Sequence, residues 1–251
     1  AFEDCETILR TTAGLHEDPL VISLLIEIAV NTSALKQMQL VLDQSDPPPA
    51  CLRSAMTVLE EAGKPGRMTR VLKGERCFAI PGASDLVIDL LTDDVHGIFI
   101  GPRPPFYRRP FLRCRAIDET TRFVRYLGLL LEVAELPWCE AKPRIDEIPM
   151  PSMDEHLPRV FDISSFETMA DSIFAWNVLA ARLHLTRTGI ALKLYRAATG
   201  CYPDGLSDLV PDYLCALPGD PFSGKELVYR PEGGGFILYS LGANLADDAG
   251  V

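Results

Sequence analysis

The chain has 251 residues, of which 47% are hydrophobic and 24% are charged. This composition is typical of a globular protein with one large or two smaller cores, and it excludes collagen-like, low-complexity and disulfide-dense classes. The net charge of -11 argues against general nucleic-acid binding and against binding to an anionic membrane surface. We therefore expect protein partners or self-association.

The start of the chain predicts that a segment is missing. The chain opens on Ala1 without an initiator methionine, and it has no recognisable signal peptide. Its longest apolar run, residues 20–30, contains Glu27 and has the length of a buried helix instead of a membrane span. We interpret the chain as a processed or trimmed product, attached to a membrane only through an N-terminal anchor outside this sequence.

The first two-thirds of the chain predict helices separated by proline-rich turns. Asp18 and Pro19 suit an N-cap and a first helical position, and apolar residues then recur every three or four positions up to Leu42. Prolines at 47–49 end this helix. We predict a helical bundle or an α-hairpin stack over residues 1–136. Further helical patterns cover three segments, at residues 50–62, 68–78 and 110–136.

A change of composition follows this helical region. Residues 137–160 contain five prolines and little periodicity, so we predict a linker there. Ser164 and Glu167 then form a capping-box pattern, which predicts the start of a long helix that ends at Gly200. A short helix is predicted at 206–210.

The C-terminal segment predicts a β-hairpin. Residues 227–230 and 236–239 have strand-like patterns, and three glycines at 233–235 lie between them. The predicted fold class is therefore α+β. A helical domain at 1–136 is followed, after the linker, by a long helix packed on a small antiparallel sheet at 161–251.

An ordered set of short motifs occupies the C-terminal third. Residues 202–203 (YP) follow the long helix, residues 220–222 (DPF) precede the first strand, and residues 238–244 (LYSLGAN) close the second strand. In this order the motifs resemble the C-terminal part of the major pseudopilin of type II secretion, a family within the type IV pilin-like proteins. The resemblance implies a long helix packed on a small sheet.

Most of the chain also resembles membrane-anchored envelope proteins of planctomycete-type bacteria. In those proteins a membrane anchor and a helical region precede a pseudopilin-like tail. The resemblance rests on the helix start at residues 18–23 (DPLVIS) together with the C-terminal motifs. It implies a location in the cell envelope, periplasmic or extracellular. It does not point to any known activity.

The resemblance to the major pseudopilins implies a calcium site. In that family the loop after the second strand binds calcium, a cation that takes six to eight oxygen ligands. The matching loop here offers the backbone carbonyl of Leu241 and the side chains of Asn244, Asp247 and Asp248. Asn244 stands where the family has an aspartate, and the loop is shorter than the family's. The alternative is an acidic turn exposed to solvent.

A further group of residues suggests another kind of site. Residues 103–125 contain seven arginines with aromatic residues between them, which suits an anionic ligand or an acidic partner; the alternative is a helix face whose arginines pair with acids. The ligand-binding candidates are Arg108, Arg109, Arg113 and Arg115.

The cysteines predict one disulfide candidate. The count of seven is odd, so at least one thiol is free. Cys201 and Cys215 flank a short segment, and a disulfide between them would indicate an oxidising compartment. The alternative is that the cysteines are buried structural thiols, since most of them have apolar neighbours.

The sequence contains no phosphate-binding loop, dinucleotide fingerprint or Gly-x-Ser-x-Gly nucleophile motif. It predicts a non-enzymatic structural or interaction protein of the bacterial cell envelope, with a pseudopilin-like and calcium-stabilised C-terminal module. Two alternatives stay open. One is a helical binding module for a peptide or an anionic ligand, and the other is an enzyme whose residues meet only in the folded chain.

Overall fold

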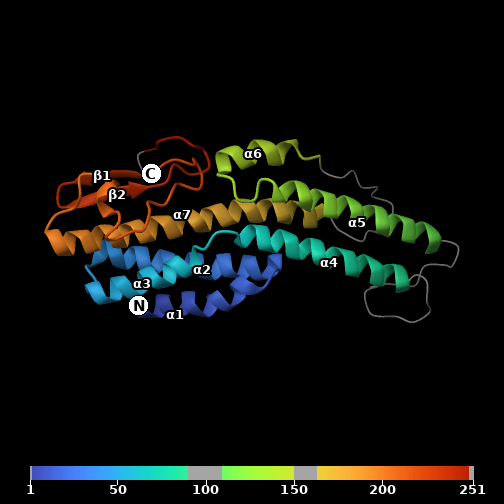
Figure 1. The fold of residues 1–251 in the computed structure, drawn as a ribbon, viewed down its shortest axis with the longest axis horizontal. Coiled ribbons are helices and arrows are strands. Elements are labelled where there is room, and N and C mark those ends of the chain that lie inside the picture. Colours follow the sequence, from blue (N-terminus) through green and yellow to red (C-terminus); the bar gives the residue numbers. More distant parts are fainter. Residues whose placement is uncertain (1, 90–108, 150–162, 249–251) are drawn as a thin grey trace.

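A computed structural model describes residues 2–89, 109–149 and 163–248 (Figure 1). The described chain is elongated, with helices along its length and a small sheet at one end. The predicted α+β class is confirmed. In chain order the elements are α1 (Phe2–Thr12), the 3-10 helix η1 (Ala13–Glu17), α2 (Val21–Gln44), α3 (Pro49–Ala62), α4 (Arg67–Asp89), α5 (Arg109–Leu131), α6 (Trp138–Glu147), α7 (Ile163–Thr199), the 3-10 helix η3 (Leu206–Leu209), β1 (Val228–Glu232) and β2 (Gly235–Tyr239).

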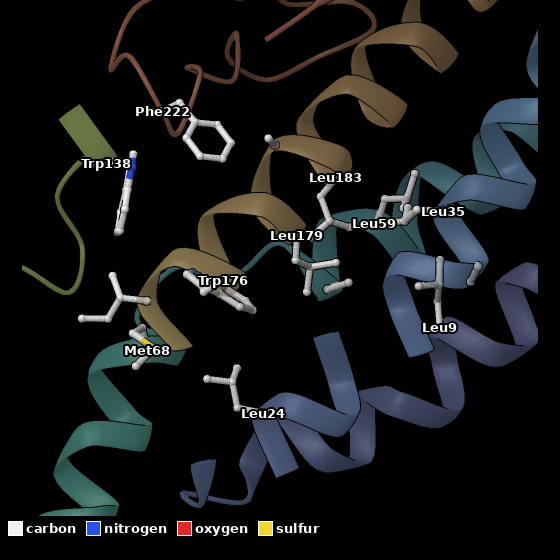
Figure 2. Packing of buried hydrophobic residues seen from close by; sticks show 14 of the residues in the cluster. Leu9, Leu24, Leu35, Leu59, Met68, Trp138, Trp176, Leu179, Leu183 and Phe222 are labelled. Carbon is white, nitrogen blue, oxygen red and sulfur yellow. The ribbon is translucent and has the colours of Figure 1, made fainter. Parts of the chain in front are cut away.

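Helices α1, α2, α3 and α7 form a bundle. Helix α7 contacts both α2 and α3, and α1 contacts the same two helices from the other side. Figure 2 shows Leu179 and Leu183 of α7 pointing toward leucines of the first three helices, including Leu35 and Leu59. All four side chains are fully buried. Because apolar burial is the main driving force for helix packing, the N-terminal helices depend on α7 for their core.

The apolar stripe predicted for α2 is confirmed. Leu24, Leu35, Met38 and Leu42 are buried, and Asn31 is buried in the same row. The stripe turns toward α1 and α7. By length and composition alone, α2 could cross a membrane. This was not predicted from the sequence, because only the apolar run at residues 20–30 was considered.

Helix α2 begins two residues later than the sequence predicts. Leu20, and not Asp18, occupies the N-cap position. Asp18 instead accepts the Ser23 hydroxyl at 2.6 Å, and the Val21 N–H donates to the Glu75 carboxylate of α4 at 2.7 Å. The free N–H of this helix terminus is therefore satisfied by a side chain distant in sequence, which a local pattern does not reveal.

A buried ion pair joins α2 to α4. Glu27 and Arg67 are each 1% exposed, and Arg67 Nε donates to Glu27 Oε2 at 2.9 Å. The other guanidinium nitrogens donate to the carbonyls of Asp18 and Leu15, at 2.7 and 2.9 Å. His16 Nδ1 lies 3.1 Å from the second oxygen of Glu27. The hydrogen bonds of this charged cluster hold η1, α2 and α4 together.

Helices α4 and α5 pack against each other as a hairpin, here called the arm, that projects from the bundle (Figure 1). The start of α7 packs on its inner half. The rings of Phe123 and Phe166 lie 5.1 Å apart in an edge-on arrangement. The Tyr126 hydroxyl donates to the carbonyl of Phe166 at 3.1 Å, and burial raises the pKa of Tyr126 to about 12.

Ten residues of the predicted linker 137–160 form α6, which the lack of periodicity did not indicate. The first two N–H groups of α6 donate to the carbonyls of Pro221 and Phe222, at 2.8 and 2.9 Å. One buried core continues from α1 past α6 to Leu227 beside the sheet. The core thus runs across the predicted boundary, and the division into two domains stays a prediction.

The predicted β-hairpin is confirmed. Strands β1 and β2 pair antiparallel, with Val228 opposite Tyr239 and Glu232 opposite Gly235. Gly233 in the turn has a φ of +56°, a backbone conformation that glycine adopts without strain. The hairpin packs against the C-terminal part of α7.

Candidate functional site

The structure brings together two of the four predicted calcium ligands. Asn244 Nδ2 donates to Asp248 Oδ2 at 2.8 Å, and the loop turns back at Leu245, whose φ is +56°. Asp247 instead accepts the hydroxyl of Tyr239, a hydrogen bond that raises the pKa of Tyr239. Across residues 2–89, 109–149 and 163–248, no three His, Cys, Asp or Glu side chains form a metal-binding group. Calcium binding by this loop stays a prediction.

A buried carboxylate that the sequence analysis missed ties the loop to the rest of the module. Asp220 is 1% exposed and accepts the hydroxyls of Ser240 and Ser223, at 2.6 and 2.7 Å. It also accepts the N–H groups of Phe222 and Leu241, at 3.1 and 3.3 Å. Leu241 was expected to bind calcium through its backbone carbonyl. In the structure, its backbone N–H donates to Asp220. The signal in the sequence that could have indicated this role is the Asp-Pro pair at residues 220–221, which is typical of a turn.

The predicted arginine site is not assembled among the described side chains. Arg108 lies outside the described residues, and so does the side chain of Arg109. Arg115 Nε donates to Glu119 Oε1 at 2.7 Å, which is the pairing that the alternative interpretation expects. Arg113 is two positions away on α5, and residues two apart on a helix do not share a face.

Cys201 and Cys215 are free and exposed thiols, so their pairing stays a prediction. The expectation that the cysteines are mostly buried is wrong. Cys5 alone is buried, and Cys77 and Cys114 are exposed as well. Apolar neighbours in the sequence do not indicate which face of a helix a cysteine occupies.

A groove of about 540 Å³ lies where the bundle meets the sheet. The end of α2, the second half of α7 and strand β2 form its walls. Across it, Gln39 Nε2 donates to Thr186 Oγ1 at 3.2 Å. Its lining includes Asp43, Asp46, Gly189, Lys193, Arg196, Tyr202 and Phe236.

The groove carries charges of both signs. Lys193 Nζ donates to Asp46 Oδ1 at 2.7 Å, and this hydrogen bond holds the pKa of Asp46 below its ordinary value. Arg196 Nη1 donates to the Tyr202 hydroxyl at 3.2 Å, with its guanidinium 5.1 Å from the centre of that ring. The Tyr202 ring packs edge-on to Phe236 at 4.9 Å. Cations, anions and aromatic edges therefore line one open surface.

Gly189 lies in the interior of α7 and lines the groove. A Cβ atom added at this glycine would meet no atom within 4 Å. Glycine in a helix interior is about 0.5–1 kcal/mol less favourable than alanine. The helix thus gives up stability at a position where the missing side chain leaves the groove open. A glycine inside a long helical pattern was the signal in the sequence.

No protein-family model, no curated protein and no solved structure matches this chain.

Proposed function

We propose that this chain is a non-enzymatic interaction protein of the bacterial cell envelope, and that the groove between α2, α7 and β2 holds an extended peptide segment of a partner. The observation that carries the proposal is Gly189, a helix-interior glycine with open space in place of its side chain. No packing contact accounts for a glycine at this position, because nothing lies near its Cβ.

The chemistry of the lining favours a peptide over a small anion. Lys193 already pairs with Asp46, so the groove has no concentrated positive charge. Asp43 and Arg196 add one further charge of each sign, and Phe236 offers a half-buried ring. A peptide presents backbone hydrogen-bond donors and acceptors as well as side chains. The charged, polar and aromatic lining of the groove can bind both its backbone and its side chains.

The cellular location is part of this proposal and rests on the resemblances alone. The envelope proteins that the chain resembles are membrane-anchored, so we propose a periplasmic or extracellular position with an anchor before Ala1. The pseudopilin-like C-terminal module would then form a folded platform outside the membrane, with the groove beside it.

We expect a random dodecapeptide library displayed on phage to yield peptides that bind the wild-type chain. Gly189→Phe fills the groove, so it should weaken the selected peptides at least tenfold in fluorescence anisotropy. Gly189→Ala is the matched control, because it adds one methyl group and should retain binding while stabilising α7. Equal binding to Gly189→Phe and Gly189→Ala would remove the groove as the peptide site.

We also propose that the loop at 241–248 binds calcium, as the resemblance to the major pseudopilins implies; Asn244 and Asp248 of this loop lie within hydrogen-bond distance of each other. At a hundredfold excess over Kd, a ligand specific for the folded state stabilises it by about 2.7 kcal/mol. Calcium should therefore raise the Tm of the wild-type chain above its value in chelator. Asp247→Ala/Asp248→Ala should abolish the rise, and Asp212→Ala, outside the loop, should keep it. An unchanged wild-type Tm would contradict the site.

A further inference from the structure

One face of the arm combines cations with exposed apolar side chains. On α4, Lys73, Arg76 and Ile80 recur at spacings of three and four residues, and on α5 Arg113 and Ile117 are four residues apart. Ile80 and Ile117 are 56% and 55% exposed. This face therefore presents two exposed aliphatic side chains beside three cations.

These residues lie on the same side of the arm. Leu72 and Ala79 of α4 and Ala116 of α5 are buried and mark the seam between the helices. Because the helices run antiparallel, the residues that directly follow these three turn toward one common side. Ile80 and Ile117 are two such residues. Tyr126 of α5, which contacts Phe166 of α7, lies on the opposite side of this seam, so among the described residues α7 does not cover the face that carries the cations and isoleucines, here called the basic face.

The acids among the described side chains of the arm do not neutralise the basic face. Within residues 67–80 and 109–131 there are three acids, and each has another partner. Glu75 accepts the Val21 N–H, Asp118 pairs with an arginine at 2.8 Å, and Glu119 pairs with another at 2.7 Å. Over residues 67–131 the sequence has eleven basic and seven acidic residues, whereas the whole chain has a net charge of -11. The arm is thus a basic element on an acidic protein.

A complementary surface lies at the other end of the molecule. Asp204, Asp208 and Asp212 are exposed around η3, just beyond the C-terminal end of α7 (Figure 1). No lysine or arginine occurs between residues 197 and 224, and Val210 in the middle of the segment is 36% exposed. Residues 204–212 are here called the acidic segment.

We propose that the basic face of the arm binds the acidic segment of a second copy of this chain. Three cations of the basic face would meet three carboxylates of the acidic segment, and the exposed valine of that segment would lie against the two isoleucines. The contact uses different surfaces on the two copies, so a bound pair keeps one free arm, on one copy, and one free acidic segment, on the other. Such a heterologous contact produces open, head-to-tail assemblies instead of closed dimers. The proposal is independent of the groove.

Sedimentation velocity of the full chain tests the contact. At low ionic strength the sedimentation coefficient should rise with protein concentration, and high salt should reverse the rise because exposed ion pairs are screened. Lys73→Glu/Arg113→Glu and Asp208→Arg/Asp212→Arg should each remain monomeric when alone. Mixing these two variants should restore association, because each reversed surface then meets a complementary one.

The control is Lys36→Glu/Arg53→Glu, which makes the same charge change on exposed positions of the bundle and should associate like wild type. Circular dichroism confirms that each variant is folded. A wild-type chain that stays monomeric at low salt would overturn the proposal, as would a mixture of reversed variants that does not associate. Wild-type binding to phosphatidylserine-containing vesicles without self-association would assign the basic face to an anionic membrane instead, and would also overturn it.

Discussion

Replacing Arg67 by methionine is expected to lower the free energy of unfolding by about 3–5 kcal/mol, because Glu27 would remain buried without its partner. The substitution also leaves the carbonyls of Asp18 and Leu15 without their donors. Urea denaturation followed by circular dichroism measures the change as a shift of the midpoint at constant m-value.

Two further variants separate the buried charge from the general loss of an arginine. Arg70→Met removes an exposed ion pair with Glu17, 2.8 Å long, and should cost less than about 1 kcal/mol. The double variant Glu27→Leu/Arg67→Met removes both charges and should recover much of the lost stability. Equal losses of unfolding free energy for Arg67→Met and Arg70→Met would show that the buried ion pair stabilises the chain no more than the exposed one.

Gly74→Ala is expected to destabilise the chain by about 1–3 kcal/mol, since it forces the packing between α4 and the segment before α2 to open. A Cβ at Gly74 would lie 2.1 Å from the carbonyl oxygen of Pro19 and 2.4 Å from its Cβ. Neither atom belongs to a flexible side chain, so the backbone itself must shift. Thermal and urea unfolding of the variant measure the loss.

The same substitution at a second helix glycine is expected to have the opposite sign. Gly128 lies within α5, and a Cβ there would meet no atom within 4 Å. Gly128→Ala should therefore stabilise the chain by about 0.5–1 kcal/mol through helix propensity alone. If both glycine variants shifted stability in the same direction, the close approach at Pro19 would not be the cause.

Helical periodicity was enough to predict the apolar positions on the inner face of α2. Asn31 interrupts an otherwise apolar stripe, and the structure satisfies it with the Thr12 hydroxyl at 2.6 Å. The start of the same helix was mispredicted because its first N–H, that of Val21, is satisfied by Glu75, more than fifty residues away. Local patterns thus specify faces, and distant side chains decide where an element begins.

The functional surfaces depend even more on contacts between distant residues. The walls of the groove come from residues such as Gln39 and Thr186, which only the folded bundle brings together. The role of Asp220 depends in the same way on Ser240, twenty positions later. The separation of Arg113 from Arg115, by contrast, follows from helical geometry and was predictable.

The position of α7 in the chain has a consequence for biosynthesis. Helices α1 to α3 are complete by Ala62, yet the helix that covers their apolar faces begins only at Ile163, about a hundred residues later. A nascent chain on the ribosome therefore carries three incompletely covered helices while the arm and α6 are still being translated. Chaperones bind exposed apolar faces of this kind, and chains that expose them tend to aggregate. The protein can complete this core only after α7 has been translated, so a product truncated before α7 would lack a stable bundle.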